Sequence, residues 1–107
     1  MAKNLKLTDK VTFGSGTTST SFTLQGTIPL AILTPAGLAS TSFTFQCSLD
    51  GANYFDLYNG SSAYSLTVAA SRYIALNPDV FEGVRHIRIV AGSSETAKDI
   101  FIVSGER

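Results

Sequence analysis

The chain of 107 residues has few of the residues from which reactive sites and covalent cross-links are made: one cysteine, one histidine, one methionine and no tryptophan. A single cysteine excludes an internal disulfide. Charged residues make up only 15% of the chain, against about 25% in an average globular protein. Serine and threonine replace them, which favours strands with a hydroxyl-rich solvated face. Residues 1–107 are long enough to form one domain with a core of its own.

Charge of one sign and long apolar runs are also missing. Eight basic and eight acidic side chains give a net charge of zero. Nucleic-acid binders carry a basic patch, because lysine and arginine displace the counterions of the phosphates, so this class is disfavoured. No run of about 18 apolar residues is present that could span a bilayer. The N-terminal residues contain no apolar core of a signal peptide, so we expect synthesis in the cytoplasm.

Apolar residues recur with a period of two between frequent turn signals. Residues 43–49 alternate Phe, Phe, Cys and Leu on one face, and residues 86–89 alternate His and Arg with Ile. This pattern predicts an all-β fold, an antiparallel β-sandwich of jelly-roll type with about eight strands. The apolar run at residues 100–103 predicts a strand covered on both faces, and residues 92–96 predict a loop. The predicted core contains Phe43, Phe45, Leu66, Val68, Ile87 and Ile89.

A single short helical turn is predicted near residues 78–82. Asn77 can cap the first free amides, and Pro78 suits the first helical position, where no N–H is needed. Gly83 then permits the left-handed exit that ends such a turn.

The N-terminal residues 1–20 predict a flexible arm. Glycine and hydroxyl residues fill positions 14–20, while Leu5 and Leu7 stand between lysines and offer apolar surface to a neighbouring subunit. We expect the arm to contribute Leu5, Leu7 and Lys10 to an interface.

No catalytic constellation is visible, so the sequence predicts a protein that is not an enzyme. Nucleophilic catalysis would pair His86 with an activated Ser or Cys and an orienting carboxylate, but the chain has no G-x-S-x-G motif. We interpret His86 and Arg88, which share one face of a strand, as interface residues. Cys47 in its alternating run is interpreted as a buried small hydrophobe rather than a reactive thiol.

Carboxylates and aromatics around one hairpin leave three alternatives to weigh against ordinary turn and core roles. Asp50 and Asp56 with nearby asparagines could form a calcium loop, but Ala52 breaks the calcium-loop pattern, so ordinary turn chemistry is favoured. A glycosidase carboxylate pair has no positive sign in the sequence. Three aromatics, at positions 54, 55 and 58, could form a sugar-stacking platform, although the core is the favoured place for alternate members. We expect no cofactor and no metal.

Two stretches resemble a known group of proteins. Residues 72–90, with their LNP, FEG and RHIRI motifs, resemble the C-terminal part of small virion proteins of tailed bacteriophages, in which a Ser-Gly-rich loop and a last strand follow. Residues 91–94 and 100–103 match that loop and strand. Residues 48–54, SLDGANY, resemble a Ser-x-Asp-Gly-x-x-aromatic hairpin of sandwich modules in phage tails and glycan-binding proteins.

This resemblance implies a structural protein of a virion. The favoured expectation is a capsid decoration or cement protein that binds the major capsid protein or other virion proteins and forms homo-oligomers, trimers by analogy. Its place would be the virion, with no membrane partner. The alternatives are a carbohydrate-binding β-sandwich module or a tail or head-completion component.

Overall fold

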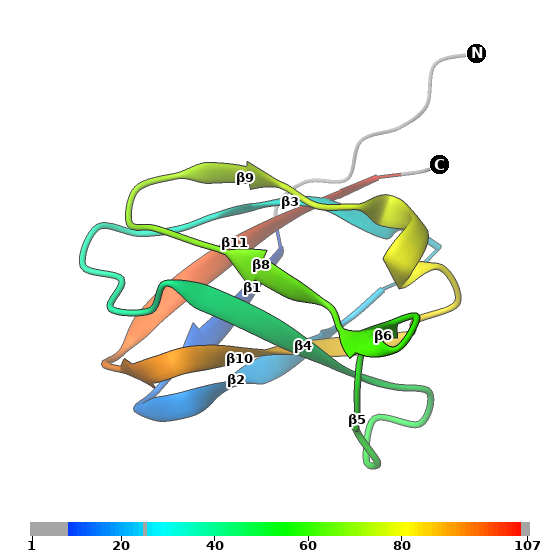
Figure 1. The fold of residues 1–107 in the computed structure, drawn as a ribbon. Helices are drawn as coiled ribbons and strands as arrows, with labels where there is room; N and C mark the ends of the chain where they lie inside the picture. The colour runs from blue at the N-terminus through cyan, green and yellow to red at the C-terminus, as the bar shows by residue number, and fades with distance from the viewer. Residues whose placement is uncertain (1–8, 25, 106–107) are drawn as a thin grey trace.

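The computed structural model describes residues 9–24 and 26–105, which form two antiparallel sheets packed face to face (Figure 1). The first sheet contains, in spatial order, β1 (Asp9–Phe13), β11 (Lys98–Gly105), β3 (Ile28–Leu33) and β9 (Tyr73–Ala75). The second contains β2 (Gly16–Thr23), β10 (His86–Glu95) and β4 (Ser42–Ser48), and β4 pairs further with β5 (Phe55–Asp56) and β8 (Ser65–Thr67). A small separate ribbon is formed by β6 (Tyr58–Asn59) and β7 (Ser62–Ala63).

The order of the strands is that of a jelly roll. Apart from the two-residue strands β5, β6 and β7, the chain alternates between the two sheets at every step except from β4 to β8. Early and late strands are interleaved, because β11 lies between β1 and β3, and β10 lies between β2 and β4. Eight strands arranged in two such nested sheets define the jelly roll. The predicted fold class is therefore confirmed.

The core lies between the sheets and follows the period of two. Ile87 and Ile89 of β10 stand opposite Cys47 and Phe45 of β4, and the residues between them face outward. Five of the six predicted core residues are buried, and the sixth, Leu66, is half-buried against them. The prediction of the core is confirmed, since each strand buries alternate apolar residues.

The predicted helical turn is present as the 3₁₀ turn η1 (Pro78–Phe81). The side chain of Asn77 accepts a hydrogen bond from the Asp79 amide at 3.2 Å, and Gly83 takes a φ of +83°, as the capping residues require. Phe81 is the anchor of this turn. Its ring meets Phe45 and Tyr64 edge-on, at centroid distances of 5.3 and 5.7 Å.

A buried carboxylate ties the end of β10 to the loop between β3 and β4. Glu95 accepts hydrogen bonds from the amides of Ala39 (3.1 Å) and Ser40 (2.7 Å) and from the Ser40 hydroxyl, and it forms an ion pair with Lys98 at 2.9 Å. Burial alone raises the pKa of Glu95, but these hydrogen bonds outweigh it and lower the pKa to about 2. Glu95 is therefore charged at neutral pH although its side chain is inaccessible to solvent.

The prediction of an arm over residues 1–20 is wrong for residues 9–20. Val11 and Phe13 of β1 are fully buried in the core, because alternate apolar residues fit an edge strand as well as they fit an arm. The hydroxyl-rich segment forms the edge strand β2, where the Ser19 hydroxyl accepts a hydrogen bond from the Ile89 amide at 2.9 Å. Residues 1–8 lie outside the described residues.

Three local predictions are also wrong. Leu49 lies just beyond the end of β4 and is 72% exposed, because the strand stops before this residue can reach the core. The predicted loop at residues 92–96 belongs largely to β10, which continues to Glu95 because its carboxylate is held in the interior. The last strand is covered on one face only, since Phe101 between Ile100 and Ile102 is 43% exposed.

Gly92 lies so close to Ser42 of the neighbouring strand β4 that a side chain does not fit there. A Cβ at this position would lie 2.6 Å from the Ser42 Oγ and 3.2 Å from the Ser42 carbonyl oxygen. We expect Gly92→Ala to lower the free energy of unfolding by about 1–3 kcal/mol, the usual cost of overpacking. Gly14→Ala is the matched control, because a Cβ there meets nothing within 4 Å. Urea denaturation of both variants tests this, and equal stabilities would contradict it.

Candidate functional site

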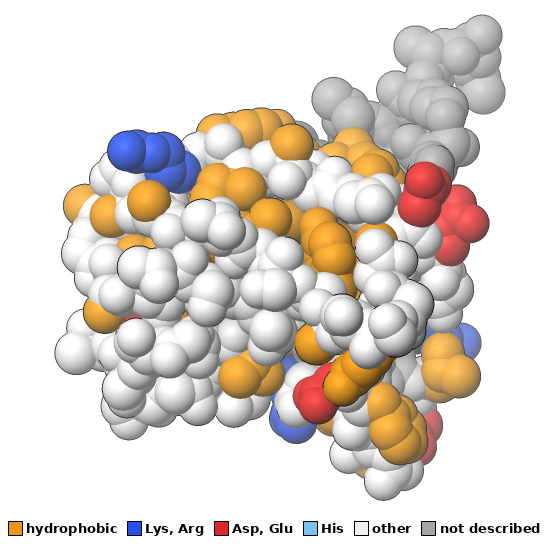
Figure 2. All heavy atoms as spheres, viewed as in Figure 1, with side chains coloured by type: hydrophobic (Ala, Val, Ile, Leu, Met, Phe, Trp, Pro, Cys, Tyr) orange, Lys and Arg blue, Asp and Glu red, His pale blue; other side chains and the backbone are white. Residues whose placement is uncertain are grey.

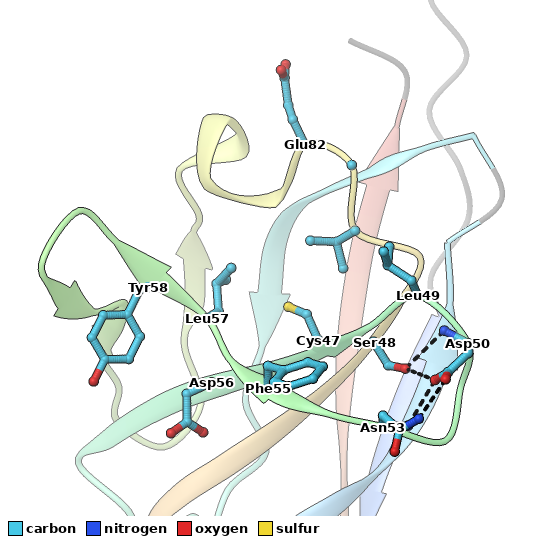
Figure 3. A pocket seen from close by; sticks show the side chains of 12 residues that line it. Cys47, Ser48, Leu49, Asp50, Asn53, Phe55, Asp56, Leu57, Tyr58 and Glu82 are labelled. Carbon is cyan, nitrogen blue, oxygen red and sulfur yellow. Dashed lines mark hydrogen bonds between the residues drawn. The ribbon is translucent and has the colours of Figure 1, made fainter.

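An apolar groove of about 540 Å³ lies at one end of the sandwich (Figure 3). It is bounded by the turn between β4 and β5, by the strand segment that follows the turn, and by residues 82–84 after η1. Cys47 and Leu57 point into the hollow. Leu49, Phe55 and Tyr58 stand around it. We call this site the end groove.

The apolar residues around the end groove are unusually exposed. Leu49 is 72% exposed, Phe55 is 71% exposed and Tyr58 is 56% exposed. Figure 2 shows hydrophobic side chains at the surface over β5 and β6, at the lower right of the molecule. Clustered exposed apolar side chains mark interaction sites, since scattered ones are normal but a contiguous group costs solubility. The end groove is therefore a candidate binding site.

The favoured interpretation of the hairpin aromatics as core residues is wrong. Phe55 pairs with Cys47 from the two-residue strand β5, and its side chain is 71% exposed. Tyr54 is half-buried on the outer face, where the Arg88 guanidinium lies 4.0 Å from its ring centroid. This arrangement is a cation–π contact.

The turn that carries the groove is closed by its own side chains. Asp50 accepts hydrogen bonds from the amides of Ala52 and Asn53, both at 2.9 Å, from the Asn53 side chain at 2.8 Å and from the Ser48 hydroxyl at 2.8 Å. These hydrogen bonds, the one from the Asn53 amide first among them, hold the pKa of Asp50 well below its usual value. Gly51 supplies a φ of +79°. The interpretation of this segment as ordinary turn chemistry is therefore confirmed.

The groove carries charge of one sign. Asp50, Asp56 and Glu82 belong to its lining, and among the described residues no lysine or arginine does. Asp56 accepts a hydrogen bond from the side-chain Nε2 of Gln46 at 3.0 Å, and the side-chain Oε1 of Gln46 accepts one from Arg88 at 2.8 Å. Figure 3 shows the Asp56 and Glu82 carboxylates directed outward from the apolar hollow, so the negative charge lies at its rim.

Cys47 lies in the groove but its thiol is not activated. Burial raises the pKa of Cys47 to about 11, so the thiol stays protonated at neutral pH. The side chain is half-buried beside core residues. No group of three His, Cys, Asp or Glu side chains that could hold a metal occurs among residues 9–24 and 26–105.

The predicted interface residues do not come together in one place. Lys10 lies on β1 in the first sheet, where it forms an exposed ion pair with Asp99 at 3.3 Å. His86 and Arg88 lie on β10 in the second sheet, and His86 contacts the Thr23 hydroxyl at 3.0 Å. Leu5 and Leu7 lie outside the described residues.

A second apolar surface lies on the outer face of the first sheet. Phe101, Leu33 and Tyr73 stand side by side on β11, β3 and β9, because they are register partners across these strands. Phe101 is 43% exposed and Tyr73 is 67% exposed. We call these three residues the aromatic row. Lys10, the register partner of Phe101, stands at its end.

The sequence indicates the end groove only through the less favoured alternative of a sugar-stacking platform at positions 54, 55 and 58, and it does not predict the aromatic row. The groove depends on where β4 stops relative to the first sheet, and alternation alone cannot show this. One signal was present, because aromatic and apolar residues at positions 54, 55, 57 and 58 exceed what one face of a strand can bury.

No family model, curated protein or solved structure matches this chain. No helix in the described part of the chain is both long enough and apolar enough to cross a membrane.

Proposed function

We propose that this protein is a non-enzymatic structural component of a bacteriophage virion, a decoration or cement protein that binds the capsid lattice. The observation that carries the proposal is the presence of two separate exposed apolar surfaces, the end groove and the aromatic row, on one rigid jelly roll. A subunit that binds a shell and also its own neighbours needs two such surfaces, whereas a monomeric binding module needs one.

The resemblance of residues 48–54 and 72–103 to phage virion proteins supports the same function. The fold is compatible with it, since jelly rolls occur in viral capsid proteins as well as in lectins, although a fold alone does not imply a function. Within this proposal the aromatic row is the surface that meets the shell. The row lies on a four-stranded face whose flanking charges, Lys10 and Asp99, neutralise each other, so its apolar residues can be desolvated at low electrostatic cost.

The proposal predicts binding to a repeated site. Quantitative mass spectrometry of purified particles is expected to find the protein at a copy number in the hundreds, and shells that carry it are expected to resist heat better, because a ligand that prefers the intact shell stabilises it. The double variant Tyr73→Ser/Phe101→Ser is expected to weaken shell binding by at least about tenfold, as loss of buried aromatic anchors does. Leu66→Ala is the control for lost stability, because Leu66 is half-buried against the core and lies in the other sheet from the aromatic row. A few copies per particle would indicate a tail or head-completion component, and absence from particles would overturn the proposal.

A carbohydrate-binding module is the second candidate. Phe55 and Tyr58 are exposed aromatic rings beside Asp56, and rings flanked by carboxylates are the usual means of stacking and hydrogen bonding a sugar. Glycan-array screening followed by NMR titration tests this candidate. Saturable binding that Phe55→Ser removes and Tyr73→Ser preserves would favour it over the virion proposal.

A further inference from the structure

We propose that the end groove binds the N-terminal segment, residues 1–8, of a second copy of this chain. These eight residues, MAKNLKLT, directly precede Asp9, the first of the described residues. The proposal concerns contacts between copies, and it stands or falls independently of what the aromatic row binds.

The apolar parts of the two surfaces match. The groove offers Leu49, Phe55 and Tyr58 around a hollow that Cys47 and Leu57 enter, and these three side chains are exposed among the described residues. The N-terminal segment has two apolar side chains, Leu5 and Leu7, spaced by two residues. In an extended segment such residues point to the same side, so both leucines can enter one groove.

The charges of the two surfaces are opposite. Asp50, Asp56 and Glu82 make the groove rim acidic, and no lysine or arginine among the described residues belongs to its lining. Lys3 and Lys6 make the segment basic, and residues 1–8 contain no acidic residue. In an extended segment Lys3 lies on the same side as the two leucines, where it faces the acidic rim, and Lys6 lies on the opposite side. Complementary charge of this kind fixes the partner and the register of an interface.

The geometry makes the contact heterologous rather than self-complementary. The segment of one copy enters the groove of the next, so each copy gives one element and receives another. Eight extended residues span at most about 29 Å. This length exceeds the 24 Å short axis of the subunit, so the segment can cross from one copy to its neighbour. Such contacts close into rings or extend into chains, according to the rotation between copies.

A charge-reversal experiment tests the pairing. The variant Lys3→Glu/Lys6→Glu and the variant Asp56→Lys/Glu82→Lys are each expected to self-associate about tenfold more weakly than the unchanged chain in sedimentation velocity, because like charges then face one another. Mixing the two variants is expected to restore association, since the acidic segment of one then meets the basic groove of the other. Circular dichroism establishes that each variant is folded. Failure of the mixture to associate, or an unchanged chain that is monomeric at all concentrations, would overturn the proposal.

The single cysteine provides an independent measurement. Leu5→Cys is expected to form, under mild oxidation, a disulfide between position 5 of one copy and Cys47 of another, detected by peptide mapping as the 5–47 pair. Because every chain then carries two cysteines, head-to-tail linkage gives species larger than a dimer. Leu5→Cys/Cys47→Ser is the control and can give only dimers linked through position 5. Tyr73→Cys, which is exposed to a similar degree as Phe55 but lies in the other sheet, is expected to give no link to Cys47. Absence of the 5–47 pair in the oxidised Leu5→Cys protein would overturn the proposal.

Discussion

Replacing Glu95 by alanine is expected to lower the free energy of unfolding by about 3–5 kcal/mol, the range for breaking a buried ion pair. The carboxylate satisfies the amides of Ala39 and Ser40 and the ammonium of Lys98 at the same time. Its removal leaves the Ser40 amide buried without its acceptor and takes the carboxylate partner from Lys98, which costs more than the loss of one hydrogen bond. The substitution thus releases the loop before β4 from the end of β10.

Chemical denaturation of Glu95→Ala and of Asp99→Asn measures how much stability each carboxylate contributes. Asp99 also pairs with a lysine, but the Lys10–Asp99 pair is largely exposed, with side chains 55% and 36% accessible. Exposed pairs contribute at most about 1 kcal/mol, so Asp99→Asn is expected to change little. A loss below about 1 kcal/mol in Glu95→Ala would show that this network does not hold the loop.

The same carboxylate predicts how stability depends on pH. The pKa of Glu95 is lowered from 4.5 to about 2 in the folded protein, so the unfolded chain binds the proton more readily. The stabilisation is therefore complete above about pH 4.5 and is lost as the pH falls toward 2. Thermal melts between neutral and strongly acidic pH are expected to show a smaller acid-induced decrease in Glu95→Gln than in the unchanged protein. Parallel decreases in both would contradict this assignment.

Phe81→Ala is expected to cost about 3–5 kcal/mol, as large aromatic truncations in a core do. The Phe81 side chain is 1% exposed and stands edge-on to two other rings. It is also the buried anchor of η1, and Glu82 and Gly83, which follow it directly, line the end groove. We therefore expect this substitution to loosen one wall of the groove as well as the core.

Val80→Ala separates the two effects. Val80 belongs to the same turn but is only partly buried, so its truncation is expected to cost less than half as much. Denaturant unfolding gives the stability, and amide exchange of residues 82–84 gives the mobility of the groove wall. If both variants lose the same stability, Phe81 is not the anchor of this turn.

Much of the fold could be predicted because its local signals agree with one another. The alternation at residues 43–47 and 86–89 shows which side chains face the core, and a strand offers no other way to bury them. Asn77, Pro78 and Gly83 each suit only a few backbone positions, and together they locate η1. These predictions depend only on residues that are close in sequence, so the local pattern is sufficient to make them, and the structure confirms them.

What could not be predicted depends on distant parts of the chain. Val11 and Phe13 look the same in an arm and in an edge strand, and only the presence of β11 beside them decides between the two. The sequence around Glu95 predicts a polar loop, because the amides of residues 39 and 40 that hydrogen-bond its carboxylate are distant in sequence. Leu49 and Phe55 continue a core pattern of alternation, but Leu49 follows the end of β4 and Phe55 lies on a two-residue strand, and both side chains are exposed. In each case pairing between distant segments overrides the local signal.

The nested strand order also determines when the protein can fold during its synthesis. β10 and β11 are made after all the other described strands, yet each lies in the interior of its sheet, between strands that are made much earlier. Until Lys98–Gly105 has left the ribosome, β1 and β3 have no strand between them, and the apolar faces of both half-sheets stay open to solvent. Pairing of β1 and β2 must therefore wait for translation of β10 and β11, and such long-range pairing is intrinsically slow. Ribosome-bound chains that stop before residue 86 are expected to remain sensitive to proteases and to need protection by chaperones.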